Sequence, residues 1–384
     1  MEPQTVLDNV AVVAQAFAKD RRARQMRRHL EPVDFEALAG AGFLLTGVPE
    51  SMGGLWRDLP SSIRPISEIL RTISRGDPSV ALVSAMHPAV LAFWLGTPNA
   101  PSEHAEAWRA QTALVCQQAL DGLWWGTITS EPGSGGDIMR SKAVAARDGE
   151  GYRLSGQKHF GSGSGNSSFV ITTGIPEGET AADFFYLDVR DAPWDGSTGM
   201  RLVAEWDGHG MIATQSHAFE FSGYPATRLA WPNATRAVSN VLSTSAAAFF
   251  SAVIVGVVQS AVEAARVQVL RRKDDLRPVE QVEWVRVENE AWLIDQAYEG
   301  LLRAIEARGA GAGLSTLHGK TAIAELAESA TQRICRVIGG GSFHRSSPYG
   351  AAFEDVRALG FLRPPWVLAF DQILDRTWQQ YGST

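Results

Sequence analysis

The spacing of apolar residues changes twice along the chain. From Thr5 to about Leu120, apolar side chains recur every three or four positions. One such stripe consists of Leu7, Val10, Ala14 and Phe17, and a second consists of Ile63, Ile66, Ile69, Leu70 and Ile73. A period near 3.6 residues places these side chains on one face of a helix. The first third of the chain therefore predicts packed amphipathic helices.

Between Leu123 and about Ala230 the period falls to two, and β-branched and aromatic residues concentrate. Six short runs carry this pattern: Trp124–Ser130, Ser141–Arg147, Tyr152–Gly156, Phe169–Thr173, Phe184–Val189 and Ser216–Phe221. Turn residues separate the runs, and no helical pattern lies between them. Successive strands of this kind disfavour a doubly wound parallel sheet and favour a small antiparallel barrel or sandwich.

The helical period returns after Ser243. Two long stripes follow: Val287, Ala291, Ile294, Tyr298, Leu301, Leu302 and Ile305, then Ile323, Leu326, Ala327, Ala330, Ile334, Val337 and Ile338. The segment Gly309–Gly313 between them predicts a hinge. The most apolar stretch, Ala246–Val258, is about thirteen residues long, which is too short to span a bilayer and predicts a buried helix.

Composition narrows the class of protein. The chain has 384 residues, of which 45% are hydrophobic and 20% charged, so it can bury a sizeable core. The net charge of −7 and the absence of a basic block argue against nucleic acid or an anionic membrane as partner. Cys116 and Cys335 are too few for a disulfide framework or a four-thiolate metal site, so we expect no metal. The first thirty residues lack the apolar segment of a secretory signal, and we expect a cytoplasmic protein.

Two familiar catalytic patterns fail when their spacing is counted. Gly313 and Gly319-Lys320-Thr321 resemble a phosphate-binding loop, yet five residues separate the glycines where four are needed. The chain also contains no G-x-S-x-G and no H-E-x-x-H segment. Hydrolase and zinc-enzyme functions therefore have little support.

Three polar segments of the predicted barrel are rich in hydroxyls and glycines. They are Thr127–Asp137, Leu154–Gly163 and Trp206–Ser216. Such a rim suits a polar heteroaromatic ring that carries several carbonyls and a diphosphate. The alternative is that the three segments are only tight turns of the barrel.

These segments, with others, make the chain resemble the acyl-CoA dehydrogenase superfamily over nearly its whole length. The motifs that carry the resemblance are Leu38–Pro49 with Gly53-Gly54, Arg75–Ser79, Ser130–Asp137, Gly156–Phe160 and Ile338–Phe343. The resemblance implies an α+β fold with an N-terminal helical domain (1–120), a middle antiparallel β-barrel (121–235) and a C-terminal four-helix bundle (236–384). It also implies FAD bound between barrel and bundle, in a homo-oligomer (a tetramer or dimer) whose neighbouring subunit completes the site.

The resemblance assigns cofactor contacts residue by residue. It implies a flavin-facing strand at Thr127, Thr129 and Ser130, ring contacts from Phe160 and Ser162, a diphosphate contact from Arg272, and a glycine turn toward the adenine at Gly339, Gly340 and Gly341. Arg336 stands where the family has a glutamine before that turn, and Asp275 where it has a phenylalanine.

The catalytic base of the family is missing from this chain. Dehydrogenation of an acyl thioester needs a carboxylate to remove the α-proton. The position of the family's glutamate falls at or next to Arg363, and the position that a minority of members use falls near Ala246 and Ala247. An arginine does not deprotonate and cannot serve as the base. Arg363 either holds an anion or forms a salt bridge to Glu354 or Asp355.

The remaining candidates resemble the oxygen-using, flavin monooxygenase branch of the same fold. His87 and Ser162 occupy places where that branch uses a histidine and a serine. The first hypothesis is an FAD oxidase or monooxygenase acting on a CoA thioester or a small aromatic or amine, with His87, Ser162 and Arg363 in acid–base and oxyanion roles. The second is an α,β-dehydrogenase of an unusual acyl-CoA with its base elsewhere. The third is a flavin-binding scaffold without turnover.

Overall fold

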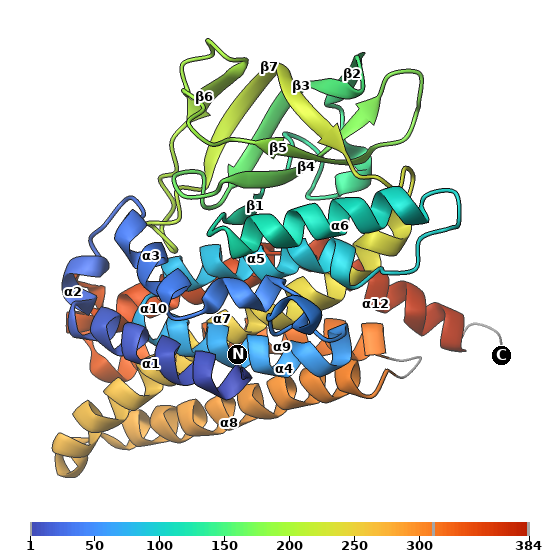
Figure 1. Ribbon diagram of the computed structural model, residues 1–384. Helices are drawn as coiled ribbons and strands as arrows, with labels where there is room; N and C mark the ends of the chain where they lie inside the picture. Colours follow the sequence, from blue (N-terminus) through green and yellow to red (C-terminus); the bar gives the residue numbers. More distant parts are fainter. Residues whose placement is uncertain (1, 309–311, 382–384) are drawn as a thin grey trace.

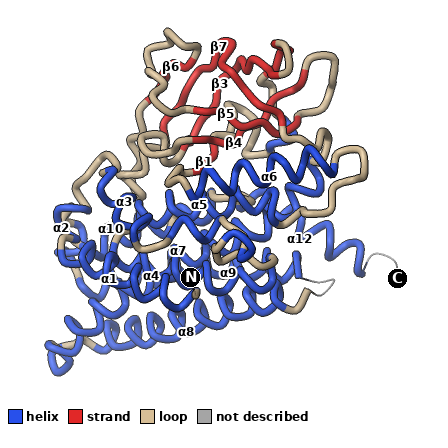
Figure 2. The backbone as a smooth tube through the Cα atoms, in the orientation of Figure 1, coloured by secondary structure: helices blue, strands red, loops and turns tan. Residues whose placement is uncertain are grey.

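Helices form the body of the molecule, and strands form a separate unit on one side of it (Figures 1 and 2). This computed structural model describes residues 2–308 and 312–381. The chain begins with α1 (Pro3–Lys19), α2 (Arg21–Arg24), α3 (Pro32–Gly40), η1 (Phe43–Gly47), η2 (Glu50–Met52), α4 (Leu59–Gly76), α5 (Pro78–Leu95) and α6 (Ala105–Leu120). Asp58 and Asp77 cap α4 and α5 by accepting hydrogen bonds from Ser61 N and Val80 N, as N-cap carboxylates do.

The strand unit follows α6. Its elements are β1 (Trp125–Thr127), η3 (Ile138–Arg140), β2 (Val144–Asp148), β3 (Gly151–Gly161), β4 (Phe169–Pro176), β5 (Asp183–Asp188), β6 (Met200–Ala204) and β7 (His217–Arg228). Pairing runs from β4 through β2, β3, β7 and β5 and returns to β4, which closes a barrel. β1 and β6 extend it by pairing with β4 and β7.

The barrel differs from the predicted one in two respects. β4 pairs in parallel with both β1 and β2, so the sheet is mixed and not wholly antiparallel. β6 has no counterpart among the six predicted runs. Most of its residues are exposed, with Met200 its only fully buried position, so its sequence lacks the alternation that marks a half-buried strand.

The C-terminal helices pack on the N-terminal ones. They are α7 (Thr235–Arg271), η4 (Lys273–Asp275), α8 (Pro278–Glu306), α9 (Ala312–Ile338), η5 (Gly340–Phe343), α10 (Pro348–Val356), α11 (Ala358–Phe361) and α12 (Trp366–Tyr381). A single apolar core contains Ile66 and Ile73 of α4 together with Val253 and Val257 of α7. A Cβ on Gly256 would collide with Ser74, so α7 crosses α4 at close range. The two helical segments therefore form one body.

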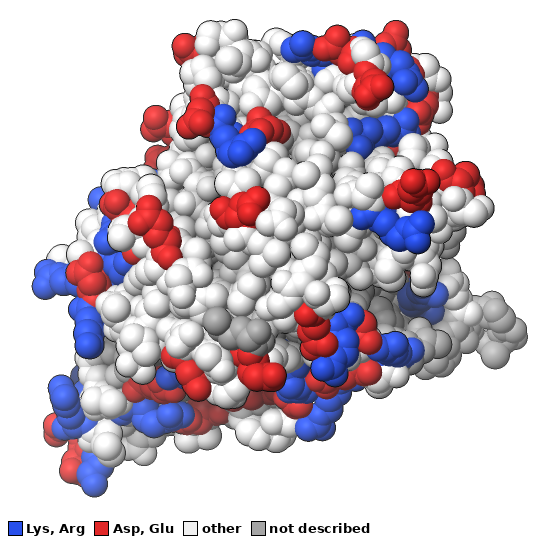
Figure 3. Space-filling view, in the orientation of Figure 1, with Lys and Arg blue, Asp and Glu red and all other residues white. Residues whose placement is uncertain are grey.

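Two helices, Pro78–Leu95 and Ala237–Arg271, are long and apolar enough to cross a membrane, but 89% and 83% of their most apolar windows are buried inside the protein. Burial of this extent is typical of core helices. Of the predicted hinge Gly309–Gly313, residues 309–311 lie outside the described residues. On the face that Figure 3 shows, basic and acidic side chains are intermixed along α8 and the barrel.

Candidate active site

A cavity of about 680 Å³ lies where the barrel meets the helices. The barrel contributes the strand end at Thr127, the turn from Ser130 to Gly136, and the loop between β6 and β7. Helices α5 and α7 contribute a second wall, and the segment from Glu354 to Pro365 contributes a third. Residues from all three parts of the chain thus meet at one concave site, which is the usual form of a small-molecule site.

One end of the cavity is apolar. It is lined by Leu82, Met86, Ala89 and Phe93 of α5 and by Leu242, Ala246 and Phe250 of α7. Steps of three or four residues put each set on one helix face, so both helices present a continuous apolar surface to the cavity. This end can hold an apolar group away from water.

The residues predicted to face the flavin line the same cavity. Thr127, Thr129, Ser130, Phe160 and Ser162 all line the cavity. Phe160 has a positive φ of 58°, which is unusual for a bulky side chain, and its ring is 59% exposed. Backbone strain of this kind concentrates at ligand sites. The structure brings these five residues together.

Arg363 bridges the C-terminal segment and the barrel. Its Nη1 donates to the carbonyl oxygen of Gly136 at 2.8 Å, and its Nη2 donates to Oγ1 of Thr129 at 2.7 Å. Burial lowers the pKa of Arg363 to about 10, so the guanidinium stays protonated at neutral pH. It forms no salt bridge with Glu354 or Asp355, because Glu354 pairs with Arg357 at 2.7 Å and Asp355 accepts the Met211 N–H at 2.6 Å. The salt-bridge alternative for Arg363 is therefore wrong.

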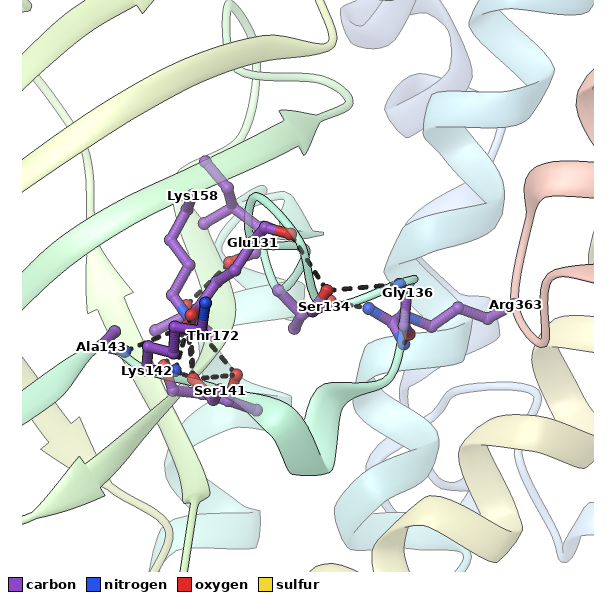
Figure 4. A network of polar contacts seen from close by, with 12 residues as sticks. Glu131, Ser134, Gly136, Ser141, Lys142, Ala143, Lys158, Thr172 and Arg363 are labelled. Carbon is purple, nitrogen blue, oxygen red and sulfur yellow. Dashed lines mark hydrogen bonds and ion pairs between the residues drawn. The ribbon is translucent and has the colours of Figure 1, made fainter. Parts of the chain in front are cut away.

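A buried ion pair supports the turn that Arg363 contacts (Figure 4). Nζ of Lys158 lies 2.5 Å from Oε1 of Glu131, and it also donates to the carbonyl oxygen of Thr173 at 2.6 Å. Burial lowers the pKa of Lys158 to about 8. Burial alone would raise the pKa of Glu131, but Lys158 and the hydroxyl of Ser141 outweigh it, so its pKa lies below the ordinary value. Glu131 is therefore an ionised, fully bonded structural residue.

A row of hydroxyls lines another part of the cavity. Oγ of Ser162 lies 2.8 Å from Oγ of Ser216, which lies 2.7 Å from Oγ1 of Thr214. All three residues line the cavity and are buried. The sequence identified the polar segment Trp206–Ser216 but not these two residues in it, because the pairing spans 54 positions.

His87 lies in the core and does not line the cavity. It is fully buried between Phe43 and Trp124, accepts the Trp125 N–H at Nδ1, and places Nε2 3.3 Å from the carbonyl oxygen of Leu44. Burial lowers the pKa of His87 to about 4, so the ring is neutral. The acid–base role predicted for His87 has no support in this geometry, since the ring is packed and bonded.

Another histidine, His159, does line the cavity. Its Nε2 is buried and has no hydrogen-bond partner among the described residues. A buried polar atom without a partner is costly, which indicates a ligand or water at this position. Phe160 follows His159 in β3, and the left-handed backbone at Phe160 interrupts the regular alternation of side chains along this strand.

The residues assigned to the adenine end lie elsewhere. Arg272 at the end of α7 contacts Glu280 at 3.2 Å and the carbonyl oxygen of Val337, and Arg336 lies 3.9 Å from Glu283. Gly339, Gly340 and Gly341 form the turn between α9 and η5, with Gly339 at a φ of 85°. None of these five residues lines the cavity of its own chain. They stay predictions for a second subunit.

No model of a protein family matches the chain. Among characterised proteins, a dibenzothiophene monooxygenase of Mycolicibacterium goodii is 29% identical over 245 residues, which are 60% of this chain and 54% of the relative. The matched part spans 54 to 64% of the length of the dibenzothiophene monooxygenases. The amino sugar nitrososynthase DnmZ of Streptomyces peucetius is 24% identical over 92% of this chain and 86% of its own.

Solved structures extend the likeness to the whole fold. KijD3, solved with FMN and a dTDP-linked amino sugar, has a TM-score of 0.79 at 21% identity and covers 99% of this chain and 94% of its own. TdsC from Paenibacillus sp. A11-2, solved with FMN and indole, has a TM-score of 0.77 at 16% identity and covers 97% of this chain and 96% of its own. With these relatives and neighbours, the motifs of the barrel and the missing glutamate lead to one assignment: the chain has the fold of the acyl-CoA dehydrogenase-like superfamily and is similar in sequence to divergent, flavin-dependent members of it.

Proposed function

We propose that the chain is a flavin-dependent monooxygenase that acts on a small apolar, aromatic substrate. One observation carries the proposal: within the described residues, every carboxylate at the cavity is already neutralised. Glu131 is paired with Lys158 and Glu354 with Arg357. The position of the family's base is held by Arg363, and the alternative position by Ala246. Abstraction of an α-proton from an acyl thioester therefore lacks its base.

The lining fits a flavin. An isoalloxazine ring needs donors for its carbonyl oxygens and an apolar or aromatic surface for its faces. Arg363 uses two of the five N–H groups of a guanidinium in protein bonds and has others for a ligand. Nε2 of His159 is a second unpaired polar atom, and Phe160 offers an exposed ring. A reduced flavin, when bound, supplies the electrons that activate oxygen.

The protein's own residues supply position and charge. The apolar end between α5 and α7 holds the substrate and excludes water, which strengthens electrostatic interactions in the cavity. Arg363 stays protonated and can stabilise negative charge that develops beside it. Ser162 supplies a hydroxyl that also lines the cavity. We retain Arg363 and Ser162 as proposed catalytic residues.

The substrate class is inferred from the apolar end. Relatives of this chain act on dibenzothiophene, and TdsC was solved with indole, so flat aromatic molecules recur among them. KijD3 and DnmZ point instead to amino sugars. The aliphatic and aromatic surface formed by Met86, Phe93 and Phe250 favours the first class. A CoA thioester, one of the expected substrates, has no support among the relatives.

Two flavins, FMN and FAD, have to be considered as the cofactor. FMN occupies the solved neighbours KijD3 and TdsC. FAD, the expected cofactor, would extend to Arg272, Arg336 and Gly339–Gly341 of a second subunit, since these residues do not line the cavity of their own chain. We therefore propose a homo-oligomer if the flavin is FAD. Replacing Arg272 with alanine would then weaken FAD binding and leave FMN binding unchanged, as titration with each flavin would measure.

The function is tested with reduced, flavin-loaded protein. Mixing it with oxygen labelled with ¹⁸O and dibenzothiophene or indole should yield a product that carries the label. Reduction of the bound flavin by butyryl-CoA without oxygen would instead support a dehydrogenase and overturn the proposal. A chain that binds flavin but converts neither kind of substrate would be the scaffold of the third hypothesis.

A further inference from the structure

Three buried hydroxyls form a continuous chain that ends at a backbone carbonyl. Ser162 Oγ lies 2.8 Å from Ser216 Oγ, Ser216 Oγ lies 2.7 Å from Thr214 Oγ1, and Thr214 Oγ1 lies 2.8 Å from the carbonyl oxygen of Met211. Thr214 is fully buried, and Ser162 and Ser216 are 8% exposed. Water therefore has little access to these groups, and each hydroxyl hydrogen has to find its acceptor inside the chain.

The contact between Thr214 and the carbonyl oxygen of Met211 fixes which hydroxyl donates in each of the three hydrogen bonds. A carbonyl oxygen cannot donate, so the 2.8 Å contact with Met211 requires the hydrogen of Thr214. Thr214 then has no hydrogen for Ser216, and Ser216 must donate to Thr214. For the same reason Ser162 must donate to Ser216. Ser162 consequently turns a lone pair, and not its hydrogen, toward the cavity.

The carbonyl at the end of the chain is held in place. Met211 has a positive φ of 50°, and its oxygen also accepts a hydrogen bond from Nε1 of Trp206 at 3.0 Å. Its N–H donates to Asp355 of α10 at 2.6 Å. A Cβ on the preceding Gly210 would collide with the carbonyl oxygen of Glu354, so this loop lies directly on α10. If the hydrogen bonds of the three hydroxyls ran in the opposite direction, the Thr214–Met211 contact would have no hydrogen.

We propose that Thr214 and Ser216 are positioning residues that present Ser162 to the ligand as a hydrogen-bond acceptor. The inference rests on the proposed flavin function and adds a specificity to it. Oxidised isoalloxazine carries an acceptor at N5, and two-electron reduction adds a hydrogen there and turns it into a donor. A serine that only accepts favours the ring form with the additional N–H. With N5 of the bound ring beside Ser162, the site would therefore bind reduced flavin more tightly than oxidised flavin.

The experiment measures dissociation constants for oxidised FMN and, without oxygen, for reduced FMN. Thr214→Val removes the acceptor of Ser216. The hydrogen bond between Ser216 and Ser162 can then reverse its direction, and Ser162 can donate to the ligand. We expect the preference for reduced FMN to fall about tenfold, as for one hydrogen bond gained or lost. A tenfold change equals about 30 mV in the two-electron midpoint potential of bound FMN, which is a second readout. Ser216→Ala should act in the same direction.

Two controls separate positioning from stability. Thr214→Ser keeps the hydroxyl and should restore the wild-type preference. Thr331→Val removes another buried threonine hydroxyl, bonded to the carbonyl oxygen of Ala327 in α9, and should leave the preference unchanged. Equal weakening of both FMN forms by Thr214→Val would overturn the inference. Failure of the proposed function would look different, because the wild-type chain would then bind neither form, or butyryl-CoA would reduce its bound flavin without oxygen.

Discussion

Arg363 and Thr129 lie 234 positions apart in the sequence, yet Nη2 of the arginine donates to Oγ1 of the threonine at 2.7 Å. This bond attaches the segment before α12 to the barrel segment that follows β1 and lines the cavity. Because Arg363 also donates to the carbonyl oxygen of Gly136, it holds the strand end and the following turn together. Arg363, which stands in the position of the family's base, thus bonds to the barrel and still has N–H groups for a ligand.

Arg363→Lys should separate these two properties. Lysine keeps the charge but cannot reach two acceptors with a planar fork, so it should lose the bridge to Thr129 and Gly136. We expect Arg363→Ala to weaken flavin binding tenfold or more and Arg363→Lys to weaken it by less, as titration of the apoprotein would measure. Unchanged affinity and turnover in Arg363→Ala would remove the proposed anion role.

Lys158→Met should destabilise the barrel strongly. The substitution leaves the carboxylate of Glu131 buried without its partner, and breaking such a pair costs about 3 kcal/mol or more. The double variant Lys158→Met/Glu131→Gln should recover part of the loss, because no charge is then left unpaired. Urea denaturation measures both. Arg153→Met breaks the exposed pair with Asp148 and, as a control, should cost less than about 1 kcal/mol.

His87 makes the protein sensitive to acid. Its pKa is lowered by burial to about 4, against 6.5 in an unfolded chain, so the folded state favours the neutral ring. The resulting stability is complete above pH 6.5 and is lost as the pH falls through 4, by about 3 kcal/mol. His87→Gln keeps one donor and one acceptor and should flatten this dependence in denaturation experiments between pH 7 and 4. His318→Gln alters an exposed histidine and should change nothing.

The same His87→Gln variant tests the predicted catalytic role. If His87 is a core residue, turnover at pH 7 should stay within a few-fold of wild type. Loss of turnover with unchanged stability and flavin affinity would restore the acid–base role.

Ala246→Leu should narrow the apolar end of the cavity. Ala246 lines that end on α7, and three further carbon atoms there would occupy the space of a substrate ring. We expect the kcat/KM for dibenzothiophene to fall about tenfold or more while FMN affinity stays unchanged. Ala264→Leu, at an exposed position of the same helix, serves as the control. Equal loss in both variants would place the substrate elsewhere.

Local pattern was sufficient for much of the fold. The apolar stripe Ile63–Ile73 lies inside α4, and the alternating run Phe169–Thr173 lies inside β4. The polar segments at Thr127–Asp137 and Leu154–Gly163 supply eleven residues that line one cavity, and the five predicted flavin contacts of the barrel are among them. Periodicity reports which face of an element is buried, and that property depends mainly on residues close in the sequence.

Contacts between segments far apart in the sequence could not be predicted from periodicity. The resemblance placed His87 near the flavin, while its ring is enclosed by Phe43 and Trp124. The sequence left open a salt bridge of Arg363 to Glu354 or Asp355 and did not indicate its bond to Thr129. The sequence by itself determined the order of helices and strands, the polar rim and the missing carboxylate base. The tertiary structure alone decided the parallel pairing of β4, the partner of Arg363 and the meeting of Ser162 with Ser216, because these depend on how whole elements pack and not on the periodicity within them.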